Sequence, residues 1–127
     1  MKKLLLLLPL LLYSSPAWAD CDLRVSRVSD GDTFHARTYT VISAYLAFSE
    51  DSGFRLHNVR APERKETDYA KAKADLQSLI GGRLVEVKLA EKRPRDKWWR
   101  FVVQVKTCDG QDVNQAMREK GWTDKGK

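Results

Sequence analysis

The 127-residue sequence has only two cysteines, two histidines and one long apolar run. No motif supplies the partners that a histidine-based metal site or a serine–histidine site would need. The apolar run, residues 4–12, is too short for a transmembrane helix, which needs about 20 residues. With 31% charged and 43% hydrophobic residues, the composition also excludes a wholly disordered chain, a multi-span membrane protein and a collagen-like fibre. The length indicates one domain.

The apolar run has the flanks of a secretory signal peptide. Lys2 and Lys3 precede it, and Ala17-Trp18-Ala19 follows it as a small-x-small cleavage site. Asp20 spoils a lipoprotein-type cleavage box, which needs a small residue there. We therefore predict a signal peptide over residues 1–19 and a single mature domain over residues 20–127. This predicts a periplasmic or secreted protein with no stable membrane insertion after cleavage.

Cys21 and Cys108 both lie in the predicted mature chain. In an exported protein, a disulfide is the first expectation for such a pair. Closing so long a loop would stabilise the fold by roughly 2–4 kcal/mol, mainly by restricting the unfolded chain. Two unpaired thiols are the less favoured alternative, and a metal site built from two lone cysteines is less favoured still.

Turn residues and apolar spacing predict the order of secondary structure. Strands are expected over residues 23–28, 33–48 (one bent strand or two), 54–59, 83–90 and 99–105. Turns are expected at residues 29–32, 50–53 and 109–110, where glycine and acidic residues gather. Five or so strands in a chain this short favour an α+β fold with a small closed barrel.

Two helices complete this pattern. Apolar residues recur every three or four positions over residues 67–80, and Gly81-Gly82 ends the run. A second helix is expected to begin at Asp112, whose side chain can cap it, with Gln115 as the reciprocal partner of a capping box. Gly121 is expected to end this helix. Both helices would pack beside the barrel.

A few charged residues could carry chemistry. Asp30 and Asp32 bracket a glycine and could face a cation, although a plain hairpin turn explains them better. Arg55, Glu63 and Arg100 would each be ordinary surface charges if they were isolated. Gathered in one cleft, the two guanidinium groups could clamp a phosphate, and the carboxylate could take a proton from an attacking water.

Seven short segments, in order, make the chain resemble the staphylococcal nuclease (thermonuclease) family over about residues 25–122. They are VSDGDTF at residues 28–34, RL at 55–56, APE at 61–63, YA at 69–70, GRLV at 82–85, DKWWR at 96–100, and DG with VN at 109–114. The resemblance implies a five-stranded OB-fold-like barrel with two to three packed helices. It also implies calcium-dependent hydrolysis of DNA and RNA at the 5′ oxygen, leaving 3′-phosphate ends.

The resemblance assigns roles residue by residue. Arg55 and Arg100 match the phosphate-binding arginines, and Glu63 matches the general base or water-orienting glutamate. Asp32 matches the first calcium ligand. Ala61 takes the place of a threonine that ligates calcium through its backbone carbonyl, so this replacement should matter little.

Arg60 departs from the family pattern, because an aspartate that ligates calcium is expected at this position. Exchanging −1 for +1 beside a divalent ion changes four charge products, or roughly 4 kcal/mol at 4 Å in water. Calcium is therefore doubtful as a cofactor. We expect Arg60 to form an ion pair with Asp32 or Glu63 at the family's metal position, an arrangement that would favour phosphate binding.

Other departures surround this predicted site. The long interval between Asp32 and Arg55 predicts that residues 39–48 extend a hairpin. Trp99 occupies a family glycine position; Trp98 and Trp99 could stack on bases of single-stranded nucleic acid, or could be partly buried against the barrel. Residues assigned to nucleic-acid binding are Arg95, Lys97 and Trp98. His57 shares strand parity with Arg55 and could flank the phosphate, although an ordinary strand histidine is the favoured interpretation.

Three functions fit these features. The first is a nuclease with weakened calcium chemistry, and the second is a metal-independent phosphodiesterase in which Arg60 replaces the metal charge. The third is a catalytically weak or inactive module that binds nucleic acid or another polyanion. We expect a monomer under each of these functions. Retention of Asp32, Arg55, Glu63 and Arg100 favours a nuclease-like phosphodiesterase acting on DNA or RNA.

Overall fold

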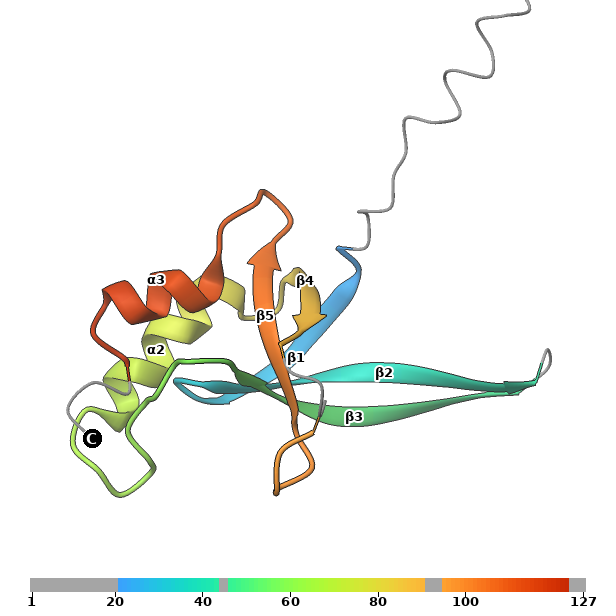
Figure 1. Cartoon of the computed structure of the whole chain (residues 1–127), viewed down its shortest axis with the longest axis horizontal. Coiled ribbons are helices and arrows are strands. Elements are labelled where there is room, and N and C mark those ends of the chain that lie inside the picture. The colour runs from blue at the N-terminus through green and yellow to red at the C-terminus, as the bar shows by residue number, and fades with distance from the viewer. Residues whose placement is uncertain (1–20, 44–45, 91–94, 124–127) are drawn as a thin grey trace, which may run out of the picture.

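The computed structural model describes residues 21–43, 46–90 and 95–123, and the predicted signal peptide lies outside them (Figure 1). The five strands form one closed barrel in the order β1-β2-β3-β5-β4. Strands β3 and β5 pair in parallel, and the other neighbours are antiparallel. This confirms the α+β barrel. The elements are β1 Leu23–Asp30, β2 Thr33–Ser43, β3 Leu46–Leu56, α2 Tyr69–Ile80, β4 Leu84–Leu89, β5 Phe101–Thr107 and α3 Val113–Glu119.

The long hairpin of β2 and β3 projects from the barrel, as Figure 1 shows. Its strands pair from Thr33 opposite Arg55 to Ser43 opposite Leu46, so the predicted extension over residues 39–48 is confirmed. The predicted turn at residues 50–53 is wrong, because these residues belong to β3. Gly53 marks a close approach instead: a Cβ there would lie 3.2 Å from Cγ of Arg100.

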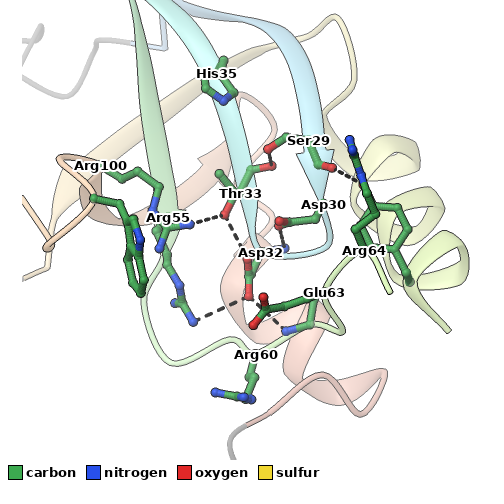
Figure 2. Close-up of a pocket in the computed structure, with 13 residues that line it drawn as sticks. Ser29, Asp30, Asp32, Thr33, His35, Arg55, Arg60, Glu63, Arg64 and Arg100 are labelled. Atoms are coloured by element: carbon green, nitrogen blue, oxygen red, sulfur yellow. Dashed lines mark hydrogen bonds and ion pairs between the residues drawn. The ribbon is translucent and has the colours of Figure 1, made fainter. Parts of the chain in front are cut away.

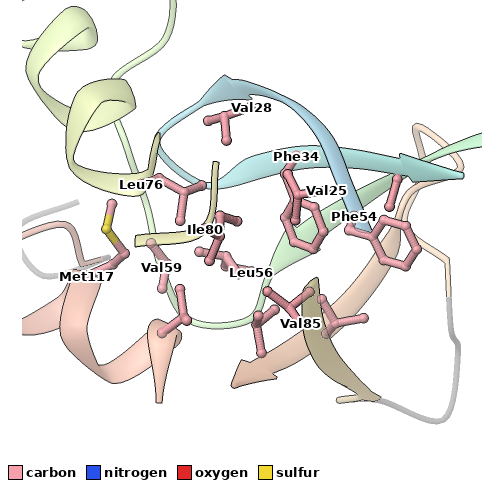
Figure 3. Close-up of a cluster of buried hydrophobic side chains, with 14 residues drawn as sticks. Val25, Val28, Phe34, Phe54, Leu56, Val59, Leu76, Ile80, Val85 and Met117 are labelled. Atoms are coloured by element: carbon pink, nitrogen blue, oxygen red, sulfur yellow. The ribbon is translucent and has the colours of Figure 1, made fainter. Parts of the chain in front are cut away.

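The core lies inside the barrel and under the two helices (Figure 3). Alternate residues of the strands point inward, and α2 contributes Leu76 and Ile80 from one face. The helix begins two residues later than predicted, after Asp68, whose φ of 69° is left-handed. The rings of Phe34 and Phe54 stack with centroids 5.1 Å apart. The apolar spacing over residues 67–80 therefore identified the helix face that packs on the barrel.

Helix α3 is fixed to the barrel by polar contacts as well as by packing. Its fully buried Asn114 accepts a hydrogen bond from the Val105 amide and donates to the carbonyls of Val103 and His57. Asp112 caps the helix by accepting from the Gln115 amide at 3.0 Å. The reciprocal half of the capping box does not form, because the Gln115 side chain donates to Glu119 instead.

A disulfide joins Cys21 to Cys108, as predicted. It ties the residues before β1 to the end of β5, which are 87 positions apart in sequence. In the part of the chain that the structure describes, no helix is long and apolar enough to cross a membrane.

Candidate active site

One pocket of about 600 Å³ opens where the β1–β2 turn, the end of β3 and the loop of residues 95–100 meet (Figure 2). It brings together Arg55, Glu63 and Arg100, the residues assigned to catalysis from the sequence. Four arginines and three acids line it, so the surface is net positive. The lining residues are Ser29, Asp30, Asp32, Thr33, His35, Arg55, Arg60, Ala61, Glu63, Arg64, Tyr69, Trp98 and Arg100.

Close packing positions the β1–β2 turn. A Cβ at Gly31 would lie 2.6 Å from the Cβ of Ala72 in α2 and 2.7 Å from that of Ala61. Only glycine therefore lets the helix and the segment after β3 approach the turn this closely. The Tyr69 hydroxyl donates to the Ser29 carbonyl at 2.6 Å and secures the same approach.

Asp32 is buried at the base of the pocket and is held by three groups. Its Oδ1 accepts from the Thr33 hydroxyl at 2.9 Å, and its Oδ2 accepts from the Ala61 amide at 3.0 Å. The guanidinium of Arg55 lies 3.5 Å from Oδ2. Arg55 also donates to the carbonyl of Leu56 at 2.8 Å. Asp32 thus orients Arg55.

Arg100 is oriented in the same way by Asp96. Its backbone amide and its Nε each donate to this carboxylate at 2.8 Å. Burial alone would raise the pKa of Asp96, but the hydrogen bonds and charge of Arg100 hold that pKa below its ordinary value. Arg100 also donates to the Thr33 hydroxyl at 3.1 Å. Asp32 and Thr33 therefore link the two arginines into one network.

The network leaves both guanidinium groups accessible. The side chains of Arg55 and Arg100 are 24% and 23% exposed, so a phosphate can reach them without unfolding the site. Glu63 is exposed and lines the same pocket (Figure 2). Its backbone is fixed by the Glu66 side chain, which accepts from the Glu63 amide at 2.7 Å. Two arginine donors and an exposed carboxylate are groups that can promote phosphodiester hydrolysis, the arginines by stabilising charge and the carboxylate by taking a proton.

Asp30 is the most perturbed acid of the pocket. Burial, together with the hydrogen bond and charge of neighbouring Asp32, raises its pKa to about 6. Its Oδ1 accepts from the Asp32 amide at 3.2 Å, as a residue at the start of a tight turn does. This carboxyl is therefore about half-protonated near pH 6, and its protonation makes the pocket more positive as the pH falls toward that value.

The structure adds His35 to the pocket, a residue to which the sequence assigned no role. Its position could have been inferred from strand alternation, because it shares the face of Thr33 on β2. Burial first, and then the charge of Arg27, lower the pKa of His35 against the opposing charge of Asp51. His57 does not line the pocket, and its ring contacts the Gln104 side chain at 3.4 Å. It therefore does not flank the phosphate site, in agreement with the favoured interpretation from the sequence.

The loop of residues 95–100 carries the three residues assigned to nucleic-acid binding. Trp98 lines the pocket, with its ring centroid 5.0 Å from Cζ of Arg100. The ammonium of Lys97 lies 4.3 Å from the same ring. Arg95 does not line the pocket; its guanidinium stacks on the rings of Trp99 and Phe101. Trp98 and Trp99 are 64% and 71% exposed, so neither is buried against the barrel.

Residues 53–125 match the model of the staphylococcal nuclease homologue family. This chain belongs to the staphylococcal nuclease family. It is also 37% identical, over 116 residues, to a protein of Escherichia coli O157:H7 and to another of Escherichia coli, each named an uncharacterized endonuclease. That similarity covers 90% of this chain and 67% of each relative. The family and these names support a nuclease-type hydrolase.

The ion pair expected at the family's missing calcium ligand does not form. Among the described residues, no acid lies within ion-pair distance of the Arg60 guanidinium, and Asp32 pairs with Arg55 instead. Val59 and Ala61 on either side are buried, so Arg60 between them points outward. Figure 2 shows its guanidinium directed away from Asp32 at the rim of the pocket. The carboxylate of Asp32 does not need Arg60 as a partner, because it is paired with Arg55 and accepts a hydrogen bond from the Ala61 amide.

The donor set does not fit the calcium site for which the family is known. Calcium takes six to eight oxygen ligands. Both oxygens of Asp32 already accept hydrogen bonds from the protein, and Arg60 brings a positive charge to the rim. In residues 21–43, 46–90 and 95–123, no group of three or more acidic, histidine or cysteine side chains could hold a metal ion.

Proposed function

We propose that this chain is a phosphodiesterase that cleaves DNA or RNA through an arginine-built phosphate site with little or no calcium dependence. One observation carries the proposal: Arg55 and Arg100 are joined through Asp32 and Thr33 in the pocket that also holds the exposed carboxylate of Glu63. An inactive binding module would have no need for that carboxylate beside the two arginines.

In the proposed reaction, the two arginines and Glu63 have separate roles. The guanidinium groups of Arg55 and Arg100 would bind the non-bridging phosphate oxygens and stabilise the added charge of the five-coordinate transition state. Glu63 would take a proton as a water oxygen bonds to phosphorus. The bond from phosphorus to the 5′ oxygen then breaks, and that oxygen keeps the electron pair and takes a proton from solvent. The products are a 3′-phosphate and a 5′-hydroxyl.

Arg60 and Arg64 would supply positive charge at the rim, where they attract the nucleic-acid backbone. The charge that a bound cation would contribute is then partly provided by the protein itself. The Cys21–Cys108 disulfide supports the further proposal that the protein is exported to the periplasm or the medium, where disulfides persist.

Digestion of single-stranded DNA and of RNA by the purified protein, with added calcium and with a calcium chelator, tests this function. We expect cleavage under both conditions, with rates that differ by less than about tenfold. Cleavage only with calcium would contradict the proposal that calcium dependence is weak or absent. Binding without cleavage under either condition would contradict the proposed enzymatic activity and favour a polyanion-binding module.

The substitution Arg60→Asp tests the role of the departing residue. It restores an acid where the family pattern has one. Because the Arg60 guanidinium is directed away from Asp32, the gain comes mainly from the new carboxylate, about 2 kcal/mol, so calorimetry should show calcium binding strengthened by roughly thirtyfold. Cleavage should become calcium-stimulated. Arg64→Asp is the matched control, because it makes the same change of charge at an exposed residue lining the same pocket. Equal calcium binding by the two variants would show that Arg60 does not determine metal affinity.

A further inference from the structure

Trp99 has an unusual backbone conformation for its residue type. The loop is a β-turn in which the Trp99 amide donates to the Asp96 carbonyl at 2.9 Å. Asp96 also accepts from the amides of Trp98 and Arg100 through its side chain. Trp99 ends the turn with a φ of 68°, in the left-handed region where glycine is the favoured residue. A bulky residue there carries a conformational cost that turn formation alone does not explain.

Arg95 supports the Trp99 ring from the barrel side. Its guanidinium carbon lies 4.6 Å from the Trp99 ring centroid and 3.9 Å from that of Phe101. It also donates to the Trp99 carbonyl at 2.8 Å. The indole is therefore held between a cation and solvent, with 71% of the residue exposed. In the described parts of the chain other than residues 38–50, the exposed large apolar side chains are Leu84, Leu89, Trp98 and Trp99.

The loop continues the phosphate pocket. Trp98 lines the pocket and lies against Arg100, and Trp99 follows it in the same turn. Lys97 and Arg95 add positive charge beside the two rings. A chain of phosphates with unpaired bases matches this surface, since cations bind the backbone and aromatic faces stack on bases. A duplex matches it poorly, because its bases already stack on one another.

We propose that Trp99 is a base-stacking residue that binds a nucleotide of single-stranded nucleic acid next to the phosphate held by Arg55 and Arg100. Arg95 is its positioning residue, and Trp98 offers a second stacking face on the pocket side. The inference rests on the proposed function for its substrate class, nucleic acid, but it does not require turnover. Binding and cleavage can therefore be tested separately.

The experiment measures binding of a short oligothymidylate, with chelator, in the Glu63→Gln background so that substrate is not consumed. In that background, Trp99→Leu removes the ring but keeps an apolar residue under the same backbone constraint, whereas Trp99→Phe keeps an aromatic face. We expect the leucine variant to bind about tenfold more weakly, which corresponds to about 1.4 kcal/mol. The phenylalanine variant should bind within about threefold of the parent.

An abasic oligomer of the same length separates stacking from phosphate binding. The parent should bind it at least about tenfold more weakly than oligothymidylate, and Trp99→Leu should show a smaller difference between the two oligomers, limited to the stacking that Trp98 contributes. Leu89→Ala, which removes an exposed apolar side chain from β4, should leave affinity unchanged. Equal affinity of parent and Trp99→Leu for oligothymidylate would overturn the stacking role. Absence of cleavage by the wild-type protein, with stacking intact, would overturn only the proposed function.

Discussion

Two turns supply the arginine pocket, and they obey different constraints. Each contains an aspartate that orients an arginine: Asp32 holds Arg55, and Asp96 holds Arg100. The first turn contains Gly31, which is buried against Ala61 and Ala72. The second ends in Trp99, an exposed residue where local backbone chemistry favours glycine.

In the first turn, packing determines which residue type is allowed. In the second turn, packing sets no such limit, and the residue faces solvent. At the buried turn, the helix and the segment after β3 leave no room for a Cβ, so the residue type follows from the fold. At the exposed turn, no neighbour excludes a large side chain, and the sequence keeps a strained one. Strain of this kind gathers at functional sites when the surrounding structure holds it in place. The two turns thus separate a requirement of folding from one of ligand binding.

The largest effect should come from the arginines that the two turns orient. Arg55→Ala and Arg100→Ala should each lower the rate of cleavage by about 10²–10³, the usual loss for one transition-state donor. Rates on single-stranded DNA, with circular dichroism to verify the fold, measure this. Arg27→Ala, on the exposed face of β1, is the control and should retain full activity. A loss below about threefold at Arg100 would exclude it from the phosphate site.

Stability should be affected most at the buried turn. Gly31→Ala places a methyl group against Ala72 and Ala61, and such overpacking costs about 1–3 kcal/mol of the free energy of unfolding. Urea denaturation measures it. Gly82→Ala is a comparison with open space around its Cβ but a φ of 67°, so it should cost only the left-handed backbone penalty of about 1 kcal/mol. A smaller loss at Gly31 than at Gly82 would mean that the turn can move away from α2.

Sequence patterns predicted the parts of the molecule whose causes are local. The helix ending at Ile80 followed from apolar spacing, and the Asp112 cap followed from residue type. The same reasoning wrongly predicted a turn at Gly53. This glycine lies in a strand, close to the side chain of Arg100, a residue distant in sequence. The convergence of Arg55, Glu63 and Arg100 came only from the family resemblance. The pairing of Arg60 failed because sequence cannot show which of two arginines reaches Asp32.

The pH dependence of stability should reveal the charge buried at the first turn. Because folding raises the pKa of Asp30 to about 6, the folded state holds this proton more tightly than the unfolded chain. Stability from this group is therefore full below about pH 4 and falls as the pH rises to about 6, by about 1.4 kcal/mol for each pKa unit. Asp30→Asn should flatten this decline in urea denaturation between pH 4 and 7. An unchanged decline would assign it to other groups.

The smallest effect concerns the exposed turn and has the opposite sign. Trp99→Gly relieves a left-handed residue, which favours the folded state by about 1–2 kcal/mol, but glycine also loosens the unfolded chain by about 0.4–1 kcal/mol. We therefore expect a net gain of about 0.5 kcal/mol in the free energy of unfolding, although the stacking contact with Arg95 is lost.

Trp98→Gly is the matched control for this last prediction. Trp98 precedes Trp99 in the same turn, is similarly exposed and is not among the residues of positive φ. Its replacement brings the entropic cost of glycine without relief of strain, so that variant should lose stability. If Trp99→Gly loses as much as Trp98→Gly, the left-handed tryptophan carries no strain. If Trp99→Gly is more stable but binds oligothymidylate more weakly, Trp99 contributes to ligand binding and lowers the free energy of unfolding.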